Sequence, residues 1–288
     1  MKRAISICMV LALLAALGAP SAASGYTGAD VRAMLETIGA CVAQTDGILS
    51  SARALIDWQL EDSAAELEAY REALRNGEEY ESEDNYDEVR AKADELDASI
   101  SSVVALRAQV DALRVTGLES VDETVAAAKT YFAWLEDALR DLMSIFDFYF
   151  AEYEAAEGLA AYDIEQYSDM SEAIAELYYV IQDMTDAMEV IDCPAFMQEC
   201  FDKYIRATRK YLAVLETMYT AIQIEDVLRS ASANYLLGRM QIEVGYCEIE
   251  LTELFNLQYE KVRNRLDGNI GTLKSELDAN CQALLGAL

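Results

Sequence analysis

Seven carboxylates crowd the stretch from Asn76 to Glu88, which reads NGEEYESEDNYDE. Three of them, Glu79, Glu81 and Glu83, alternate as the first three oxygen ligands of a calcium-binding EF-hand loop do. Such a loop also needs glycine at its sixth position and a bidentate glutamate at its twelfth, and neither stands there in this chain. We therefore interpret the stretch as a solvated turn between two helices, with Glu79, Glu81 and Glu83 as a weak cation-binding candidate.

Cysteines are the second group that could do chemistry. Apart from Cys8 in the N-terminal leader, they are Cys41, Cys193, Cys200, Cys247 and Cys281. An oxidising compartment favours disulfides, and an odd number leaves one thiol unpaired. Cys193 and Cys200 are too far apart along a helix to pair with each other. A chain turn near residue 223 places Cys200 opposite Cys247, and Cys281 then pairs with Cys193 or Cys41. We favour these disulfides over small buried core residues, the alternative interpretation.

The chain contains no histidine. This excludes the histidine-dependent zinc proteases, the Ser-His-Asp and Cys-His nucleophile systems and histidine-ligated haem. Neither a Cys-x-x-Cys motif nor a distinctive pair of carboxylates takes their place. The sequence therefore predicts a non-enzymatic protein with no catalytic residue, no resident metal and no cofactor.

Aromatic residues are plentiful, with 17 tyrosines and 7 phenylalanines. Helical spacing places Phe146, Phe150 and Tyr153 on one face, which we expect in the core. Tyrosine joins an apolar body to a polar tip, so the surplus could line a groove for a peptide, a glycan or an apolar ligand. We favour core packing over such a groove. The candidate groove residues are Phe148, Tyr149, Tyr162, Tyr167, Tyr178 and Tyr179.

The N-terminus has the composition of an export signal. Lys2 and Arg3 precede an apolar run from Ala4 to Leu17, and Ser21-Ala22-Ala23 follows it. This pattern predicts a signal peptide over residues 1–23, cleaved after Ala23. The apolar run is shorter than the roughly 20 residues of a spanning helix, and no later run approaches that length. We expect an exported, soluble chain without a stable membrane span, which is secreted, periplasmic or held at the cell surface by a partner.

The chain carries a net charge of −30. Phosphate backbones and anionic headgroups repel such a protein, so nucleic acid is excluded as a partner. The acidity fits either solubility in a crowded compartment or a saline habitat. The expected partner is a protein or a small ligand that the sequence does not identify.

Apolar residues recur at helical spacing. A stripe close to a 3.5-residue period, typical of coiled-coil packing, follows the acidic stretch. Its members are Val89, Leu96, Ile100, Val103, Leu106, Val110 and Leu113. With only two prolines and many strong helix formers, the chain is predicted to be all-α, an elongated antiparallel bundle of about six or seven long helices.

Turn residues divide these helices. Asn76-Gly77 ends the first, Ser120 to Glu123 form a capping box, and Pro194 is expected at a first helical position. We also expect a turn near residues 223–226 and a break at 267–271. An N-terminal hairpin over residues 24–116 then continues into a bundle over residues 117–288, as one domain or two. Six identities between Val121–Glu136 and Phe201–Glu216 are compatible with a duplicated helical hairpin.

The sequence thus predicts an exported, non-enzymatic binding or interaction module. Two alternatives remain open at this point. One is an α-helical pore-forming or membrane-active protein, for which Leu142–Tyr179 is the best inserting segment although it carries many acids. The other is an acidic cation-binding scaffold.

Overall fold

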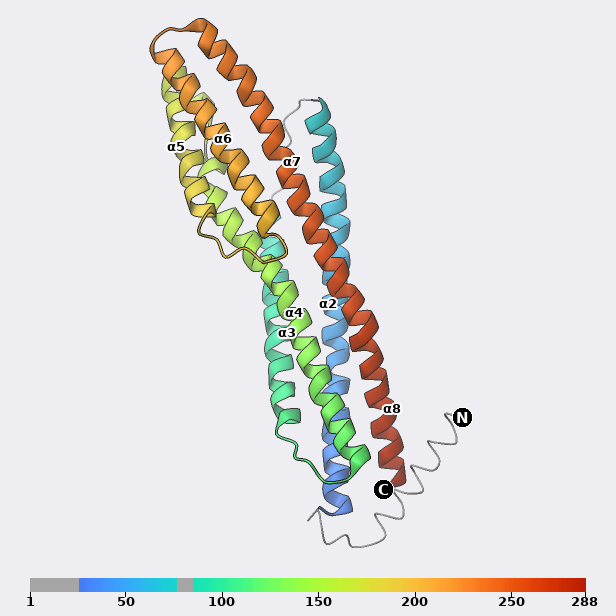
Figure 1. Ribbon diagram of the computed structural model, residues 1–288. Coiled ribbons are helices and arrows are strands. Elements are labelled where there is room, and N and C mark those ends of the chain that lie inside the picture. The colour runs from blue at the N-terminus through green and yellow to red at the C-terminus, as the bar shows by residue number, and fades with distance from the viewer. Residues whose placement is uncertain (1–25, 77–84) are drawn as a thin grey trace. The chain divides into compact units, whose positions relative to one another are not determined.

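The computed structural model describes residues 26–76 and 85–288, and that part of the chain contains helices and no strand (Figure 1). The predicted all-α helical bundle is confirmed. Helix formers dominate each segment, and proline is nearly absent. In chain order the elements are α2 (Gly28–Asn76), α3 (Tyr86–Asp111), α4 (Glu119–Ala160), the 3-10 turn η1 (Ile164–Gln166), α5 (Met170–Met188), α6 (Gln198–Gln223), α7 (Val227–Arg265), the π-turn η2 (Leu266–Ile270) and α8 (Gly271–Ala287).

The described chain divides into two compact units, each assembled from separate stretches of sequence. Among the described residues, unit 1 holds 26–57, 87–143 and 260–288. Unit 2 holds the described residues 58–76, 85–86 and 144–259. The expected hairpin over residues 24–116 and the expected bundle over residues 117–288 each contribute to both units.

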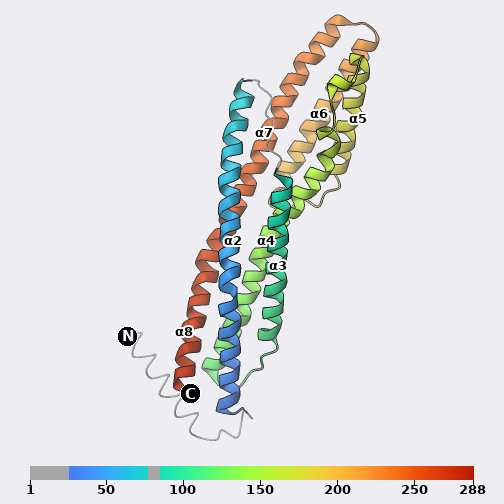
Figure 2. The ribbon, with the colours of Figure 1, turned by 180° about the vertical axis from the view of Figure 1, so that it is seen from behind.

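Unit 1 is formed by the first part of α2, by α3, by the first part of α4 and by α8, which lie side by side (Figure 2). Its largest fully buried side chains include Leu35, Phe132 and Leu139. One polar contact is enclosed with them, because the hydroxyl groups of Thr45 and Tyr131 lie 2.5 Å apart. This contact satisfies two polar groups that would otherwise be costly to bury.

Helix α3 confirms the apolar stripe read from the sequence. Six of its predicted members are buried, and Leu113, just beyond the end of the helix, is half-buried. The buried members are Val89, Leu96, Ile100, Val103, Leu106 and Val110. Spacing of three, four and seven residues keeps these side chains on one face.

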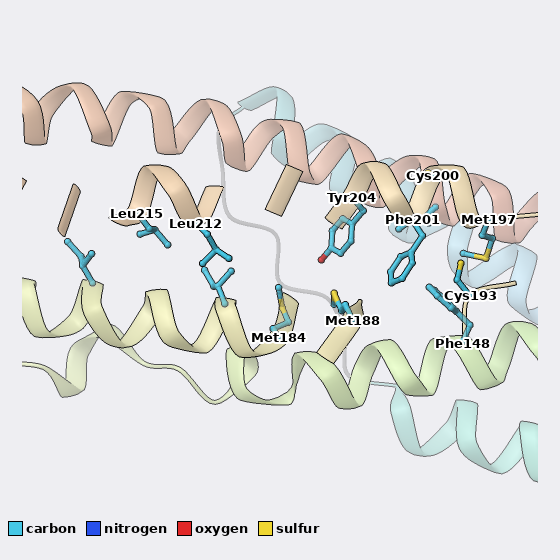
Figure 3. Packing of buried hydrophobic residues seen from close by; sticks show 13 residues of the cluster. Phe148, Met184, Met188, Cys193, Met197, Cys200, Phe201, Tyr204, Leu212 and Leu215 are labelled. Atoms are coloured by element: carbon cyan, nitrogen blue, oxygen red, sulfur yellow. The ribbon is translucent and has the colours of Figure 1, made fainter. Parts of the chain in front are cut away.

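The hydrophobic core of unit 2 joins α4, α5, α6 and α7 (Figure 3). Phe148 of α4 lies within it and is only 1% exposed. Its ring meets Phe201 of α6 edge-on at a centroid distance of 5.0 Å, and Phe255 of α7 at 5.9 Å. The alternative that Phe148 lines a groove is therefore wrong, and this residue packs in the core, because α4, α6 and α7 enclose its ring.

Two expected boundaries are also wrong. The chain does not break at residues 267–271; it continues from α7 into α8 through η2. Leu266 and Ile270 are both buried, so the π-turn accommodates an extra residue while both side chains stay in the core. Pro194 does not begin a helix either. It starts a turn in which the Met197 N–H donates to the Pro194 carbonyl at 2.8 Å, and α6 begins at Gln198.

The expected turn near residues 223–226 is confirmed, since α6 ends at Gln223 and α7 begins at Val227. Glu225 holds the turn with a left-handed φ of 55°. Asp226 caps the new helix, because the Arg229 N–H donates to its carboxylate at 3.0 Å.

Candidate functional site

The inner face of α7 is fully used in packing. Leu237, Val244 and Leu251 pack within the core of unit 2. An ion pair fixes the edge of this face, where Lys210 of α6 lies 2.5 Å from the Glu243 carboxylate. A helix anchored in this way normally turns polar and charged side chains to the opposite side.

The opposite side of α7 instead carries exposed apolar side chains from Leu228 to Tyr246, in the first half of the helix. Leu228 is 82% exposed, Tyr235 68%, Ile242 43% and Tyr246 55%. Seven of the sixteen large apolar side chains exposed in the described chain belong to this helix. We define the outer stripe as the exposed residues on this side that alternate four and three positions apart: Leu228, Ser232, Tyr235, Arg239, Ile242 and Tyr246. Exposed apolar patches of this kind typically mark binding sites.

The outer stripe lies mostly within a segment without acids. From Val227 to Ile242 there are 16 residues with no Asp or Glu, in a chain that has 52 acidic residues among 288. Beyond Asp30 no acid-free stretch of the chain is longer. The two basic residues of the segment, Arg229 and Arg239, are exposed and make no ion pair within the described residues. Sequence reasoning based on aromatic clusters missed this surface, and the gap in the acid pattern is the signal that could have found it.

A shallow hollow of about 390 Å³ lies at the α6–α7 turn, next to the start of the outer stripe. It is lined by residues of both helices and of the turn, among them Met218, Ile222, Val227 and Asn234. Its walls are mainly apolar. The hollow extends the apolar surface at the N-terminal end of α7.

Two carboxylates and two tyrosines meet inside unit 2. Tyr70 of α2 and Tyr204 of α6 both donate hydrogen bonds to the Glu248 carboxylate of α7. Glu152 of α4 lies near enough to Glu248 for their charges to repel. Figure 3 shows Tyr204 beside Phe201 in the core. We call these four residues the buried carboxylate cluster.

Burial raises the pKa values of the two carboxyl groups in this cluster. Desolvation of its carboxyl group, and then the charge of Glu248, raise the pKa of Glu152 to about 7, although the residue as a whole is only half-buried. Desolvation likewise raises the pKa of Glu248, and the bonds from Tyr70 and Tyr204 only partly oppose it. A proton on Glu152 therefore relieves the repulsion between the two carboxylates near neutral pH.

Gly245 makes room for the cluster on α7. A Cβ atom at this position would lie 2.9 Å from the Tyr70 hydroxyl and 2.9 Å from a Leu74 methyl group. We expect Gly245→Ala to destabilise the chain by about 1–3 kcal/mol through overpacking, as measured by urea denaturation.

Gly238, two turns earlier on α7, is the matched control. It is exposed, and a Cβ there would meet no atom within 4 Å. Gly238→Ala is expected to stabilise the chain by about 0.5–1 kcal/mol, because alanine favours the helix. Equal effects at the two positions would contradict the close contact at Gly245.

The aromatic groove candidates other than Phe148 lie in pairs or against neighbouring rings. Tyr162 and Tyr167 stack at a centroid distance of 5.9 Å, and Tyr178 meets Tyr179 edge-on at 5.5 Å. The Tyr162 hydroxyl donates to a carbonyl of α5. Tyr149 is half-buried against Phe150. Among these, Tyr179 is the one on an exposed position.

The predicted disulfides are not formed, since the five cysteines of the described chain are free thiols: Cys41, Cys193, Cys200, Cys247 and Cys281. Cys41 and Cys281 belong to unit 1, whereas the other three belong to unit 2. The Cys200 thiol lies 3.9 Å from the Cys247 carbonyl oxygen. Burial raises the pKa of Cys193, Cys200 and Cys281 to about 11, so the thiolate needed for disulfide exchange is scarce.

The weak cation candidate Glu79, Glu81 and Glu83, and the signal peptide over residues 1–23, lie outside the described residues. Within residues 26–76 and 85–288, no group of three or more acidic or cysteine side chains is arranged to hold a metal ion. The same part of the chain contains no helix with the length and hydropathy to cross a membrane.

The exposed outer stripe and the adjoining hollow are the surface features that most need a functional explanation. No protein-family model, curated protein or solved structure matches this chain.

Proposed function

We propose that this chain is an exported, non-enzymatic helical module that binds another protein through the outer stripe of α7. The observation that carries the proposal is the second apolar face of a helix whose first face is already packed. Burying an exposed leucine, isoleucine or tyrosine in an interface removes about 100 Å² or more of apolar surface from water, which favours association.

The surroundings of the outer stripe support the same function. The hollow beside the stripe widens the apolar surface at the α6–α7 turn. Packing of α7 in the core of unit 2 holds this helix rigid for a partner. Rigid presentation lowers the entropic cost of binding. The basic head and apolar run of the N-terminus support export.

Site-specific photo-crosslinking in the cells that make this protein tests the proposal. A photoreactive phenylalanine analogue at Tyr235, in the outer stripe, is expected to give a discrete adduct with another protein. The same analogue at Tyr179 of α5, which is 59% exposed, is the control and is expected to give none. Adducts of equal yield from both positions, or from neither, would overturn the proposal.

Export is tested separately. Mass spectrometry of the protein recovered outside the cytoplasm is expected to find a chain that begins at Ser24, directly after Ala23. An intact N-terminus on protein that stays in the cytoplasm would contradict this part of the proposal and leave the binding surface to be judged on the crosslinking result.

A further inference from the structure

The spacing of the outer stripe fits a partner helix. Leu228, Tyr235 and Ile242 are seven residues apart, so they occupy one position of a heptad repeat. The other core position of the same repeat holds Ser232, Arg239 and Tyr246. Alternation of four and three residues is the pattern with which one helix receives the side chains of another along a shallow left-handed crossing.

The arginines of the stripe determine which charge a partner helix should carry. Arg239 lies between Tyr235 and Ile242 within the stripe, and Arg229 is exposed at its start. Neither guanidinium has an ion pair in the described structure, whereas Lys203 and Lys210 of the neighbouring α6 are paired with Glu250 and Glu243 of α7. Charged residues within a helix–helix seam, such as Arg239, and beside it, such as Arg229, set the choice of partner.

A second copy of this chain fits the stripe poorly. Two outer stripes facing each other would place arginine near arginine, and the segment from Val227 to Ile242 has no carboxylate. The bordering acids are already used, because Asp226 caps α7 and Glu243 is paired with Lys210. The net charge of −30 on each chain adds a long-range repulsion.

We propose that the outer stripe of α7 binds an amphipathic helix of another protein whose apolar seam is flanked by glutamate or aspartate. This inference rests on the proposed function and adds the chemical class of its partner. The carboxylates of such a helix pair with Arg229 and Arg239, while its apolar residues cover Leu228, Tyr235 and Ile242.

Two designed peptides test the charge rule on the full mature chain. Each is about three heptads long, with leucine along the seam; one carries glutamate at all flanking positions and the other lysine. Net charge alone favours the lysine peptide, because the protein is strongly acidic. We expect the reverse, with the glutamate peptide binding at least about tenfold more tightly in fluorescence anisotropy at moderate salt, with a Kd in roughly the micromolar range.

Matched variants test whether the preference for the glutamate peptide arises at the outer stripe. Arg229→Glu together with Arg239→Glu is expected to reverse the preference, whereas Arg32→Glu together with Arg114→Glu makes the same change of charge in unit 1 and is expected to preserve it. Leu228→Ser together with Ile242→Ser is expected to abolish binding of both peptides. Far-UV circular dichroism verifies that each variant remains folded.

Several outcomes overturn the inference, and they are distinguishable from failure of the proposed function. Equal or tighter binding of the lysine peptide refutes the acidic partner. Binding of neither peptide, with a crosslinked adduct at Tyr235, refutes a helical partner and leaves the binding surface in place. Dimerisation in analytical ultracentrifugation that Leu228→Ser with Ile242→Ser abolishes identifies a second copy as the occupant. Loss of the Tyr235 adduct refutes the proposed function itself.

Discussion

Replacing Glu152 with glutamine is expected to stabilise the chain by about 2–3 kcal/mol near pH 8 and to change its stability little near pH 4. Burial and the charge of Glu248 raise the pKa of Glu152 to about 7 from its ordinary value of 4.5. Between these two values the folded chain holds a proton that the unfolded chain has lost, so stability falls as the pH rises through this window. Glutamine cannot ionise, so the variant keeps its stability as the pH rises through this window.

Urea denaturation of both proteins at about pH 4, 6 and 8 measures this effect, since one pKa unit corresponds to about 1.4 kcal/mol. The difference should grow from pH 4 to pH 8 and then level off. A difference that is constant across this range would show that Glu152 does not titrate on folding as described, and that the substitution acts through packing.

Glu136 of unit 1 supplies a control of opposite sign. Desolvation acts to raise its pKa, but hydrogen bonds from Arg140 and Arg107, each 2.9 Å long, outweigh it, so the pKa is lowered. Its stabilisation is present at neutral pH and is lost as the pH falls through the lowered value. Glu136→Gln should therefore destabilise the chain near pH 7 and have little effect in strong acid.

Phe148→Ala is expected to cost about 3–5 kcal/mol of unfolding free energy, the range for an aromatic ring removed from a well-packed core. The ring is 1% exposed and touches Phe201 and Phe255, so its removal leaves a cavity between α4, α6 and α7. Urea denaturation followed by circular dichroism measures the loss.

Two substitutions bracket this result. Phe148→Leu keeps most of the apolar volume and should cost clearly less than Phe148→Ala. Tyr179→Ala removes an exposed ring and should change stability by no more than about 0.5 kcal/mol. A loss below about 1 kcal/mol for Phe148→Ala would contradict the burial of this ring and favour the groove, the alternative to core packing.

Features encoded by short stretches of sequence could be predicted. The stripe on α3 follows from spacing alone, and the α6–α7 turn has local causes in Glu225 and Asp226. In each case the residues that determine the structure lie within one or two turns of one another.

Features that depend on residues far apart in the sequence could not be predicted. The glycines and Asp267 of the segment 267–271 signal a turn, yet burial of Leu266 and Ile270 keeps the chain helical. Phe148 remained a groove candidate because it lies off the face of Phe146, Phe150 and Tyr153, whereas α6 and α7 enclose its ring. The outer stripe of α7 has the spacing of an ordinary core face; the gap in the acid pattern marks the segment, and the packing of the opposite face shows that the stripe is exposed.

Unit 1 is assembled from distant stretches of the chain, which determines when it can fold during synthesis. Arg53 of α2 and Asp267, which lie 2.6 Å apart, are separated by 214 positions in the sequence. At ordinary rates of translation, a ribosome needs roughly 10–40 s to cover that distance. The apolar face of α2 therefore emerges long before α8, its neighbour in unit 1, exists. This unit closes only after α8 has been synthesised, and until then the face of α2 that packs against α8 is available to a chaperone that binds unfolded chains.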